Sequence, residues 1–419
     1  MQQQDVQQQK AERALDALSF FVSDARYGLG AYLGVYLLAE HGWNPGSIGA
    51  ALSIGAFTGL VSQAPLGALV DAVRAKRALI AGAVVVVTAT CLVIPFSPHF
   101  WTVAVAGLFG ALAVVTIGPT LSSISLGVVG PDRFARRAGR NEALFHLGDG
   151  SISVLILLTA PFFGNPVVFW TMVFTALASV LAAAAVPAGA INYDLARGLL
   201  PGQPTQAARR AVWRVVLDSK PLLIFAGCGA LFHLANASML GLVSQKLALG
   251  NLEQGIALTA ASAIAAQSVM VPVAALVGAR ADVWGRKPLF LVAFVALALR
   301  GTLYTLSDSP AWLIGVQLLD GVGAGLIGAL FPIIIADLTR GSGHFAAVQG
   351  AVGTVHGVGG MASMALGGLL AEQAGYNTAF LVLAAVAALG GVLFWLVMPE
   401  TRGAPAVATA DGVEAGAVP

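Results

Sequence analysis

Several ionisable side chains lie inside long apolar stretches of this chain, where a charge is costly unless it is paired or hydrated. In the stretch GRNEALFHLGDGSIS, Glu142, His146, Asp149 and Ser153 follow one another at intervals of four, three and four residues. On a helix this spacing places all four side chains on one face. Carboxyl and imidazole groups can exchange protons near neutral pH when burial and neighbouring charges shift their pKa values. The spacing therefore predicts a helix face that handles protons.

Other apolar stretches carry further polar residues. Asp24 and Arg26 are two residues apart, so they cannot face each other on one helix, and each needs a partner elsewhere. Because a guanidinium keeps its charge even when buried, Arg26 requires an acid, for which we prefer Asp149 and consider Asp320 second. The candidate residues for a substrate or proton pathway are Asp24, Arg26, Tyr27, Glu142, His146, Asp149, His233, Asn236, Gln317, Asp320 and His356.

Some of these residues also have a purely structural interpretation. Glu142 could pair with an arginine at the end of its helix, and Asp320 could neutralise Arg300 on the neighbouring apolar segment. The amides Asn236 and Gln317 could join helices to each other, as polar side chains often do inside membranes. The sequence leaves these alternatives open.

The composition is that of a protein embedded in a membrane. Hydrophobic residues make up 58% of the chain and charged residues 10%, with a mean hydropathy of +0.84, whereas soluble domains carry about 25% charged residues. The net charge of +2 gives no reason to expect nucleic acid as a partner. The chain lacks the G-x-x-x-x-G-K-[ST] phosphate loop, and its two cysteines have no metal-ligand spacing. We therefore expect neither an enzyme nor a resident cofactor or metal.

Because about 20 apolar residues cross a bilayer as a helix, the chain can be divided into transmembrane segments. The pattern predicts an all-α membrane protein with twelve transmembrane helices in two pseudo-symmetric halves of six. The predicted regions are a cytoplasmic N-terminus at 1–14, a first half at 15–187, a cytoplasmic linker at 188–219, a second half at 220–398 and a disordered cytoplasmic tail at 399–419. The predicted spans are 15–39, 46–70, 77–95, 100–128, 141–163, 166–187, 220–247, 254–279, 287–306, 310–338, 345–370 and 376–398.

The positions of the basic residues predict the orientation. With the N-terminus in the cytoplasm, all of the 22 Lys and Arg residues except Arg26, Lys246 and Arg300 fall at cytoplasmic ends or in cytoplasmic loops. Such a bias is typical of multi-pass proteins, whose cytoplasmic loops are rich in Lys and Arg. We expect a protein of the bacterial inner membrane with both termini in the cytoplasm.

One short loop occurs twice, once in each half. GALVDAVRAK and GARADVWGRK share a Gly and an Asp, and Gly67 and Gly278 are 211 residues apart, as are Asp71 and Asp282. Each loop joins the second and third predicted spans of its half. Further pairs at nearly the same separation are Pro119 and Pro332, Phe134 and Phe345, and His146 and His356. The two halves thus look like parallel repeats, an arrangement found in membrane transporters.

These features resemble the major facilitator superfamily, and the resemblance covers the whole chain. GARADVWGRK matches the loop pattern G-x-x-x-D-x-x-G-R-[KR] of that family at every position, whereas GALVDAVRAKR is a degenerate copy with Arg74 at the second glycine. The resemblance implies that the acid and the basic residues of these loops bind across the interface of the halves and hold the outward-facing state. It assigns this gating role to Gly67, Asp71, Arg77, Gly278, Asp282, Gly285, Arg286 and Lys287.

Two functions fit the sequence. The first is a proton-coupled secondary transporter that moves a small organic solute by alternating access, with an anion as a candidate because of Arg26. Resemblance to the exporting branches of the family favours efflux. Its expected partners are the solute, protons and the lipid bilayer, and we expect a monomer. The alternative is a transporter of a transition-metal ion or metal chelate, in which His146, His233, His356 and nearby acids bind the metal.

Overall fold

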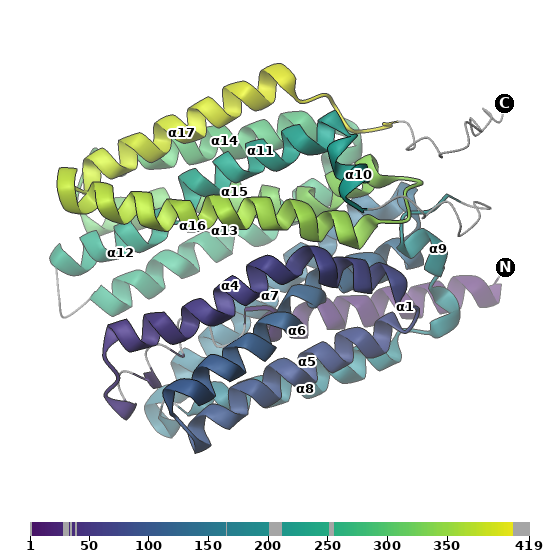
Figure 1. Cartoon of the computed structure of the whole chain (residues 1–419), viewed down its shortest axis with the longest axis horizontal. Coiled ribbons are helices and arrows are strands. Elements are labelled where there is room, and N and C mark those ends of the chain that lie inside the picture. Colours follow the sequence, from purple (N-terminus) through teal and green to yellow (C-terminus); the bar gives the residue numbers. More distant parts are fainter. Residues whose placement is uncertain are drawn as a thin grey trace.

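In a computed structural model the protein consists of long helices (Figure 1), and the structure describes residues 2–27, 33, 36–37, 40–164, 166–200, 212–250 and 255–404. No strand occurs among these residues. The helices of the first half (the N half) are α1 (Gln2–Phe21), α2 (Ser23–Tyr27), α4 (Pro45–Ala72), α5 (Lys76–Val93), α6 (Phe100–Val129), α7 (Pro131–Phe163) and α8 (Val167–Ala185).

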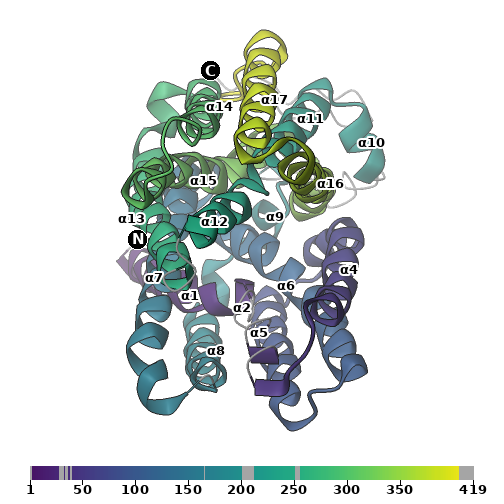
Figure 2. The same ribbon diagram turned by 90° about the vertical axis from the view of Figure 1, so that its left-hand side faces the viewer.

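The second half (the C half) contains α11 (Lys220–Asn236), α12 (Met239–Gly250), α13 (Gly255–Trp284), α14 (Arg286–Leu303), α15 (Pro310–Thr339), α16 (Phe345–Ala374) and α17 (Tyr376–Val397). Figure 2 looks along the helices and shows the two halves as separate groups, with α7 beside α13 and α4 beside α16. These two helix pairs form the main contacts between the halves.

Within the described residues, nine helical stretches are long and apolar enough to cross a membrane. The other three predicted spans are missing from this set for identifiable reasons. Only part of the first span lies within the described residues. Helix α7 begins with a run of arginines, and α14 carries Arg286, Lys287 and Arg300. Because α1 and α2 belong to the first predicted span, and α11 and α12 to the seventh, these fourteen helices correspond to a twelve-helix bundle of two halves. Their apolar outer faces fit a bilayer.

Glycine and proline set several of the helix ends. Gly130 has a φ of +73° and ends α6, and Pro131 follows as the first residue of α7. Proline favours the first turn of a helix because its missing N–H would have no partner there. The side chains of Asn44 and Ser309 accept hydrogen bonds from the first turns of α4 and α15. Helix α7 thus starts ten residues before the predicted span at 141, since the arginine-rich segment is itself helical.

The linker between the halves contacts both of them. It contains a 3-10 turn (Ala188–Ala190), α9 (Tyr193–Ala196) and α10 (Val212–Leu217). The backbone N–H of Asn192 donates to the carbonyl of Gly127 in α6, at 2.9 Å, and the backbone N–H of Gly341, after α15, donates to the carbonyl of Gly198 at 2.6 Å. Residues 201–211 of the predicted linker and most of the predicted disordered tail lie outside the described residues.

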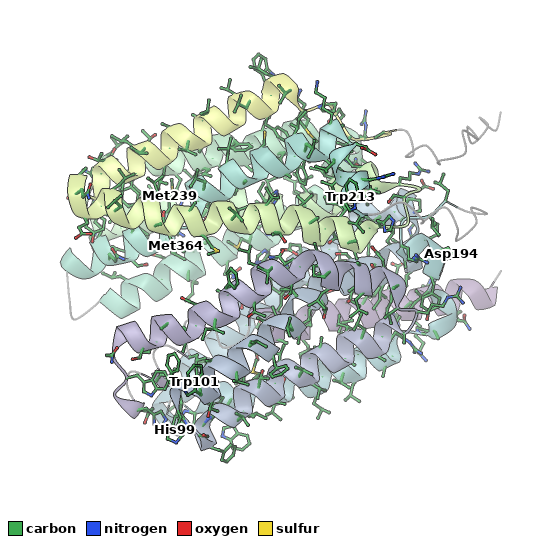
Figure 3. The ribbon with its side chains drawn as sticks, viewed as in Figure 1. His99, Trp101, Asp194, Trp213, Met239 and Met364 are labelled. Carbon is green, nitrogen blue, oxygen red and sulfur yellow. The ribbon has the colours of Figure 1, made fainter. Side chains whose placement is uncertain are left out.

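The molecule has two distinct ends. The start of α1, the end of α17, α9 and α10 lie at one end, which we call the linker end (Figure 1). Figure 3 shows Asp194 and Trp213 at that end, and His99 and Trp101 at the opposite end. Trp101 and Trp213 are 73% and 59% exposed. Exposed tryptophans near both ends of a helical bundle are typical of membrane proteins, where they lie at the two water–lipid interfaces.

Candidate transport site and gates

A cavity of about 290 Å³ lies between the two halves. Side chains from α2, α4, α6 and α7 line it on the N-half side, and side chains from α15 and α16 line it on the C-half side. Its polar lining residues are Arg26, Gln63, Ser122, Asn141, Glu142 and Gln349, and Phe134, Phe145 and Phe331 are its aromatic ones. The mixture of apolar walls and a few polar groups is that of a small-molecule site.

Arg26 forms an ion pair with an acid of α7. Its Nη1 lies 3.3 Å from Oε2 of Glu142, and its guanidinium lies 4.3 Å from the ring centre of Phe145. The side chain of Arg26 is 36% exposed, so it is accessible from the cavity. The partner that we preferred from the sequence, Asp149, was wrong, because Glu142 reaches Arg26 from a position two helical turns closer to the linker end.

The polar face predicted on α7 continues from Glu142 into the other half. Nε2 of His146 lies 3.5 Å from Oε1 of Glu142, and Nδ1 of the same ring lies 2.9 Å from Oε1 of Gln267 in α13. The amide Nε2 of Gln267 donates to Oδ2 of Asp149 at 2.5 Å. Arg26, Glu142, His146, Gln267 and Asp149 therefore form one chain of polar contacts, which we call the N-half polar chain.

Gln267 was missed at the sequence level. It lies in the apolar run TAASAIAAQSVMVPV, where it is the one amide side chain. A single amide side chain within a membrane span is a signal of function, and this signal could have drawn attention to Gln267. Its partners could not be read from the sequence, because they lie on a helix of the other half.

Asp24 and Arg26 have different partners, as predicted from their spacing. The hydroxyl of Thr175 in α8 donates to Oδ2 of Asp24 at 2.8 Å. Asp24 thus bonds within the N half and does not join the ion pair at Arg26. The side chain of the neighbouring candidate Tyr27 lies outside the described residues.

Another arginine, Arg300, is buried and has all its described side-chain partners within the C half. Nη1 of Arg300 lies 2.5 Å from Oδ1 of Asp320 and donates to Asn236 at 2.7 Å. Gln317 donates to Asp320 at 2.9 Å, and Tyr304 bonds both Arg300 and Gln317. Arg300 is 1% exposed, and none of the five residues lines the cavity between the halves. The contacts favour the structural interpretation of this C-half network.

The candidate histidines are not gathered into a metal site. The rings of His233 and His356 lie 5.2 Å apart within the C half, whereas His146 belongs to the N half. Among the described residues, no group of three or more His, Cys, Asp or Glu side chains could hold a metal ion. The geometry thus gives no support to the alternative of a metal transporter.

The degenerate copy of the repeated loop closes the linker end across the halves. The carboxylate of Asp71 accepts from the backbone N–H groups of Ala346 and Ala347, at 3.0 and 2.8 Å, at the start of α16. Asp71 is 4% exposed. A carboxylate at a helix N-terminus is stabilised by the free N–H groups and by the helix dipole. Arg77 instead donates to the carbonyl of Val186, within its own half.

The complete copy of the loop binds within its own half, contrary to expectation. Asp282 pairs with Arg286 at 2.8 Å, and Arg286 also pairs with Asp337 at 2.9 Å. Asp282 is 47% exposed, and its described side-chain partner lies in the C half. For Asp282 and Arg286 the expectation of contacts across the interface was therefore wrong, because Asp337 and the segment after α17 occupy the loop.

That segment fixes the loop through one carboxylate. Glu400 accepts from the backbone N–H groups of Arg286 and Lys287 at 2.9 and 3.0 Å, and from that of Arg402 at 2.9 Å. Partial burial raises the pKa of the Glu400 carboxyl. Together these three N–H groups lower the pKa by more than burial raises it, so the pKa lies below the ordinary value. The neighbouring Gly285 has a φ of +88°, and a Cβ there would lie 2.5 Å from Oε2 of Glu400.

Glycines let the halves approach each other closely at the linker end. A Cβ added to Gly67 would lie 2.3 Å from the carbonyl oxygen of Ala346, and one added to Gly139 would lie 2.4 Å from Cα of Gly278. Phe134 and Phe345, which the repeat relates, meet edge to face across the interface with ring centres 5.7 Å apart. The structure is therefore closed at the linker end.

A helical bundle of two repeated halves, with a polar cavity between them and close contacts between the halves at one end, is the architecture of a membrane transporter. The sequence profile of the Major Facilitator Superfamily matches residues 15–280 and 222–416. The chain belongs to the major facilitator superfamily. As in other members of this family, its function is transport rather than catalysis.

Curated relatives agree with this assignment. An uncharacterized MFS-type transporter, found in two strains of Mycobacterium tuberculosis, is 47% identical over 394 residues, which cover 94% of each chain. A multidrug resistance protein of Schizosaccharomyces pombe is 36% identical over 108 residues, or 25% of this chain and 20% of the relative.

Solved structures share the fold. A proton:xylose symporter bound to 6-bromo-6-deoxy-D-glucose is similar over 94% of this chain and 96% of its own, with a TM-score of 0.68 and 13% identity. The human organic anion transporter MFSD10 is similar over 92% of this chain and 99% of its own, with a TM-score of 0.66 and 15% identity. At these identities the likeness extends to the fold alone.

Proposed function

We propose that the protein is a proton-coupled secondary transporter that exports a small organic anion across the bacterial inner membrane by alternating access. The linker end lies in the cytoplasm in this proposal, in agreement with the bias of Lys and Arg residues toward that end. The closed linker end then makes this the outward-facing arrangement. The protein acts as a monomer, because each chain contains both halves and the cavity between them.

The observation that carries the proposal is the ion pair between Arg26 and Glu142 in the wall of the cavity. Arg26 keeps its charge, so in the empty protein Glu142 neutralises it. An anionic solute can replace Glu142 on the guanidinium, and Phe145 and Phe331 offer apolar surface beside it. The released carboxylate then takes up a proton, because an unpaired charge is costly there. Binding of the solute is in this way linked to protonation of Glu142. The solute and the proton then move in the same direction, and the outward gradient of the solute drives export.

Three similar proteins have names that agree with parts of the proposal. One similar structure is a proton:xylose symporter and another is an organic anion transporter, while a partial relative is a multidrug resistance protein. These names are consistent with proton coupling, an anionic solute and export, respectively. The proposal for this chain rests on its own cavity and on Arg26.

Proteoliposomes with a trapped pH-sensitive dye test this function. Small organic anions, cations and neutral solutes are added one by one under an imposed pH gradient. We expect proton movement with some of the anions, together with a large loss of apparent affinity in Arg26→Ala and a smaller one in Arg26→Lys, which keeps the charge but loses the forked geometry. Arg136→Ala, an exposed arginine of α7 outside the cavity, is the control. Proton movement with cations alone, or unchanged affinity in Arg26→Ala, would contradict the proposal.

A further inference from the structure

The contact between α7 and α13 contains a polar bridge that connects the two halves. Gln267 of α13 bonds His146 and Asp149, which lie one turn apart on α7. The close approach of Gly139 and Gly278 lies on the same pair of helices, nearer the linker end. Gln267 is eleven residues from Gly278, which corresponds to about 16 Å along a helix. The bridge is therefore separate from the gate and lies deeper in the bundle.

The orientation of the Gln267 amide follows from its partners. Its NH₂ group donates to Asp149 at 2.5 Å, an arrangement that suits an ionised carboxylate, whereas the reversed amide would place two acceptor oxygens against each other. The amide oxygen can only accept, so Nδ1 of His146 must carry the proton that it donates to Gln267. The ionised state of Asp149 thus determines which nitrogen of His146 is protonated.

The other nitrogen of His146 faces Glu142. When Nδ1 holds the proton of a neutral ring, Nε2 is an acceptor that faces the carboxylate oxygen at 3.5 Å. Two acceptors repel each other, so this arrangement favours an additional proton between Nε2 and Glu142. Such a proton weakens the ion pair between Glu142 and Arg26. An ionised Asp149 therefore favours the replacement of Glu142 by an anion at Arg26.

Protonation of Asp149 has the opposite effect. Its O–H can donate to the oxygen of a turned Gln267 amide, whose NH₂ group then donates to Nδ1 of His146. The ring proton consequently resides on Nε2, from which it donates to an ionised Glu142. Asp149 gains one proton from water and Glu142 loses one to water, so the number of protons on the pair stays constant. Among the described residues, the charged groups of α2 that face these two acids are Asp24, beside Asp149, and Arg26, which pairs with Glu142.

We propose that Gln267 is a positioning residue that couples Asp149 to Glu142 through His146, so that the two acids share one proton across the interface of the halves. This coupling rests on the proposed function, since it explains how the Glu142 carboxyl at Arg26 exchanges its proton. It also assigns a role to the C half. Because Gln267 belongs to α13, rocking of the halves moves the amide relative to α7 and changes which acid holds the proton.

The tautomer of His146 tests the coupling without any solute. We propose nitrogen NMR of histidine-labelled protein, with the His146 signal assigned by His146→Gln. In the parent protein at neutral pH we expect the proton on Nδ1. In Asp149→Asn, whose amide can donate as the protonated acid would, we expect it on Nε2. In a Gln267→Leu background, Asp149→Asn should leave the His146 signal unchanged.

Two further variants serve as controls. Gln267→Asn keeps the amide but is one methylene too short to reach both partners, so it should behave as Gln267→Leu if the latter does not fold. Ser268→Ala, beside Gln267 on an exposed position that bonds its own helix, should preserve the response. The same His146 signal in the parent and in Asp149→Asn, or the same response in the Gln267→Asn background, would overturn the coupling.

The transport assay distinguishes this inference from the proposed function. If the proteoliposomes show no proton-linked movement of any anion while the tautomer of His146 still responds through Gln267, the proposed function fails and the coupling stands. If anion transport is proton-linked and equally pH-dependent in Gln267→Asn, the function stands and the coupling fails.

Discussion

The two halves of this protein use their charged side chains in opposite ways. In the N half, Asp71 caps a helix of the other half, and His146 and Asp149 both bond Gln267 across the interface. In the C half, Arg300 and Asp320 neutralise each other inside the half. The loop around Asp282 and Arg286 is likewise satisfied by C-half partners.

This difference suggests a division of labour in the transport cycle. A half whose charges are paired internally can move as a rigid body, because no buried charge loses its partner during the movement. A half whose charges reach across the interface must break and remake those contacts in each cycle. In the proposed mechanism, the N half therefore contains the groups whose charge changes with the conformation, and Arg26, which is 36% exposed, binds the solute there.

The largest expected effect follows from comparing the two arginines that lie within the helical bundle, Arg26 and Arg300. Arg300→Ala leaves Asp320 as an uncompensated buried charge, which should cost about 3–5 kcal/mol of stability. Arg26→Ala should cost far less, because Arg26 is 36% exposed at the cavity. The purified variants are heated in detergent, and the fraction of protein that stays monodisperse is measured at each temperature. The unfolding temperatures of Arg300→Ala and Arg26→Ala are then compared.

A double variant sharpens this comparison. Arg300→Leu combined with Asp320→Leu removes both charges and should recover much of the stability lost in Arg300→Ala, as observed for buried pairs replaced by apolar residues. Similar losses in Arg26→Ala and Arg300→Ala would mean that the two arginines do not differ in role.

The next effect concerns the two copies of the repeated loop. Asp71→Asn retains one acceptor oxygen but turns an NH₂ group toward the second N–H of α16, so we expect the closed linker end to be about tenfold less populated. Asp282→Asn should change this population little, because its partner is Arg286 of the same half. Spin labels on the exposed positions Arg136 and Arg280 report the distance between α7 and α13. A larger effect of Asp282→Asn than of Asp71→Asn would mean that the loop at Asp282 also holds the two halves together, as the resemblance implied for both loops.

This pair of loops also shows what the sequence could predict. Apolar runs and Gly or Pro residues at their ends determine the helices, so most boundaries were within a few residues, as for α4 and α6. The match to the loop pattern assigned the same gating role to both copies, with Asp71 in one and Asp282 in the other. Whether a gate binds across the interface depends on which residues compete for it, and here Asp337 and Glu400 occupy the second loop.

The polar face of α7 illustrates the same limit. The spacing of Glu142, His146 and Asp149 predicted a shared face, and the structure confirms that these side chains belong to one chain of contacts. The partner of Arg26 and the bridge through Gln267 were not predictable, because they depend on the rotation and depth of helices that pack from other parts of the chain.

A smaller effect is expected where the halves touch through glycine. In Gly139→Ala the new methyl group would lie 2.4 Å from Cα of Gly278, a backbone atom that cannot yield without separating α7 from α13. We expect a longer distance between the labels at Arg136 and Arg280 in a fraction of the molecules. Gly150→Ala on the same helix has nothing within 4 Å of its Cβ and should leave the distance unchanged. An unchanged distance in both variants would show that the glycine contact does not hold the halves together.

The smallest effect concerns Glu400, which fixes the C-half loop without touching the N half. Its three backbone N–H partners lower the pKa of its carboxyl below the ordinary value, even though partial burial acts in the opposite direction. An acid with a depressed pKa stabilises the folded protein above its ordinary pKa, and this contribution disappears as the pH falls through the depressed value. Glu400→Gln should therefore lower the unfolding temperature by about 1–2 °C at pH 7, with the difference from the parent protein vanishing in strong acid. The label distance across the interface should stay the same at pH 7, since Glu400 acts inside the C half. An altered distance in Glu400→Gln would mean that the loop around Asp282 and Arg286 does affect the contact between the C half and the N half.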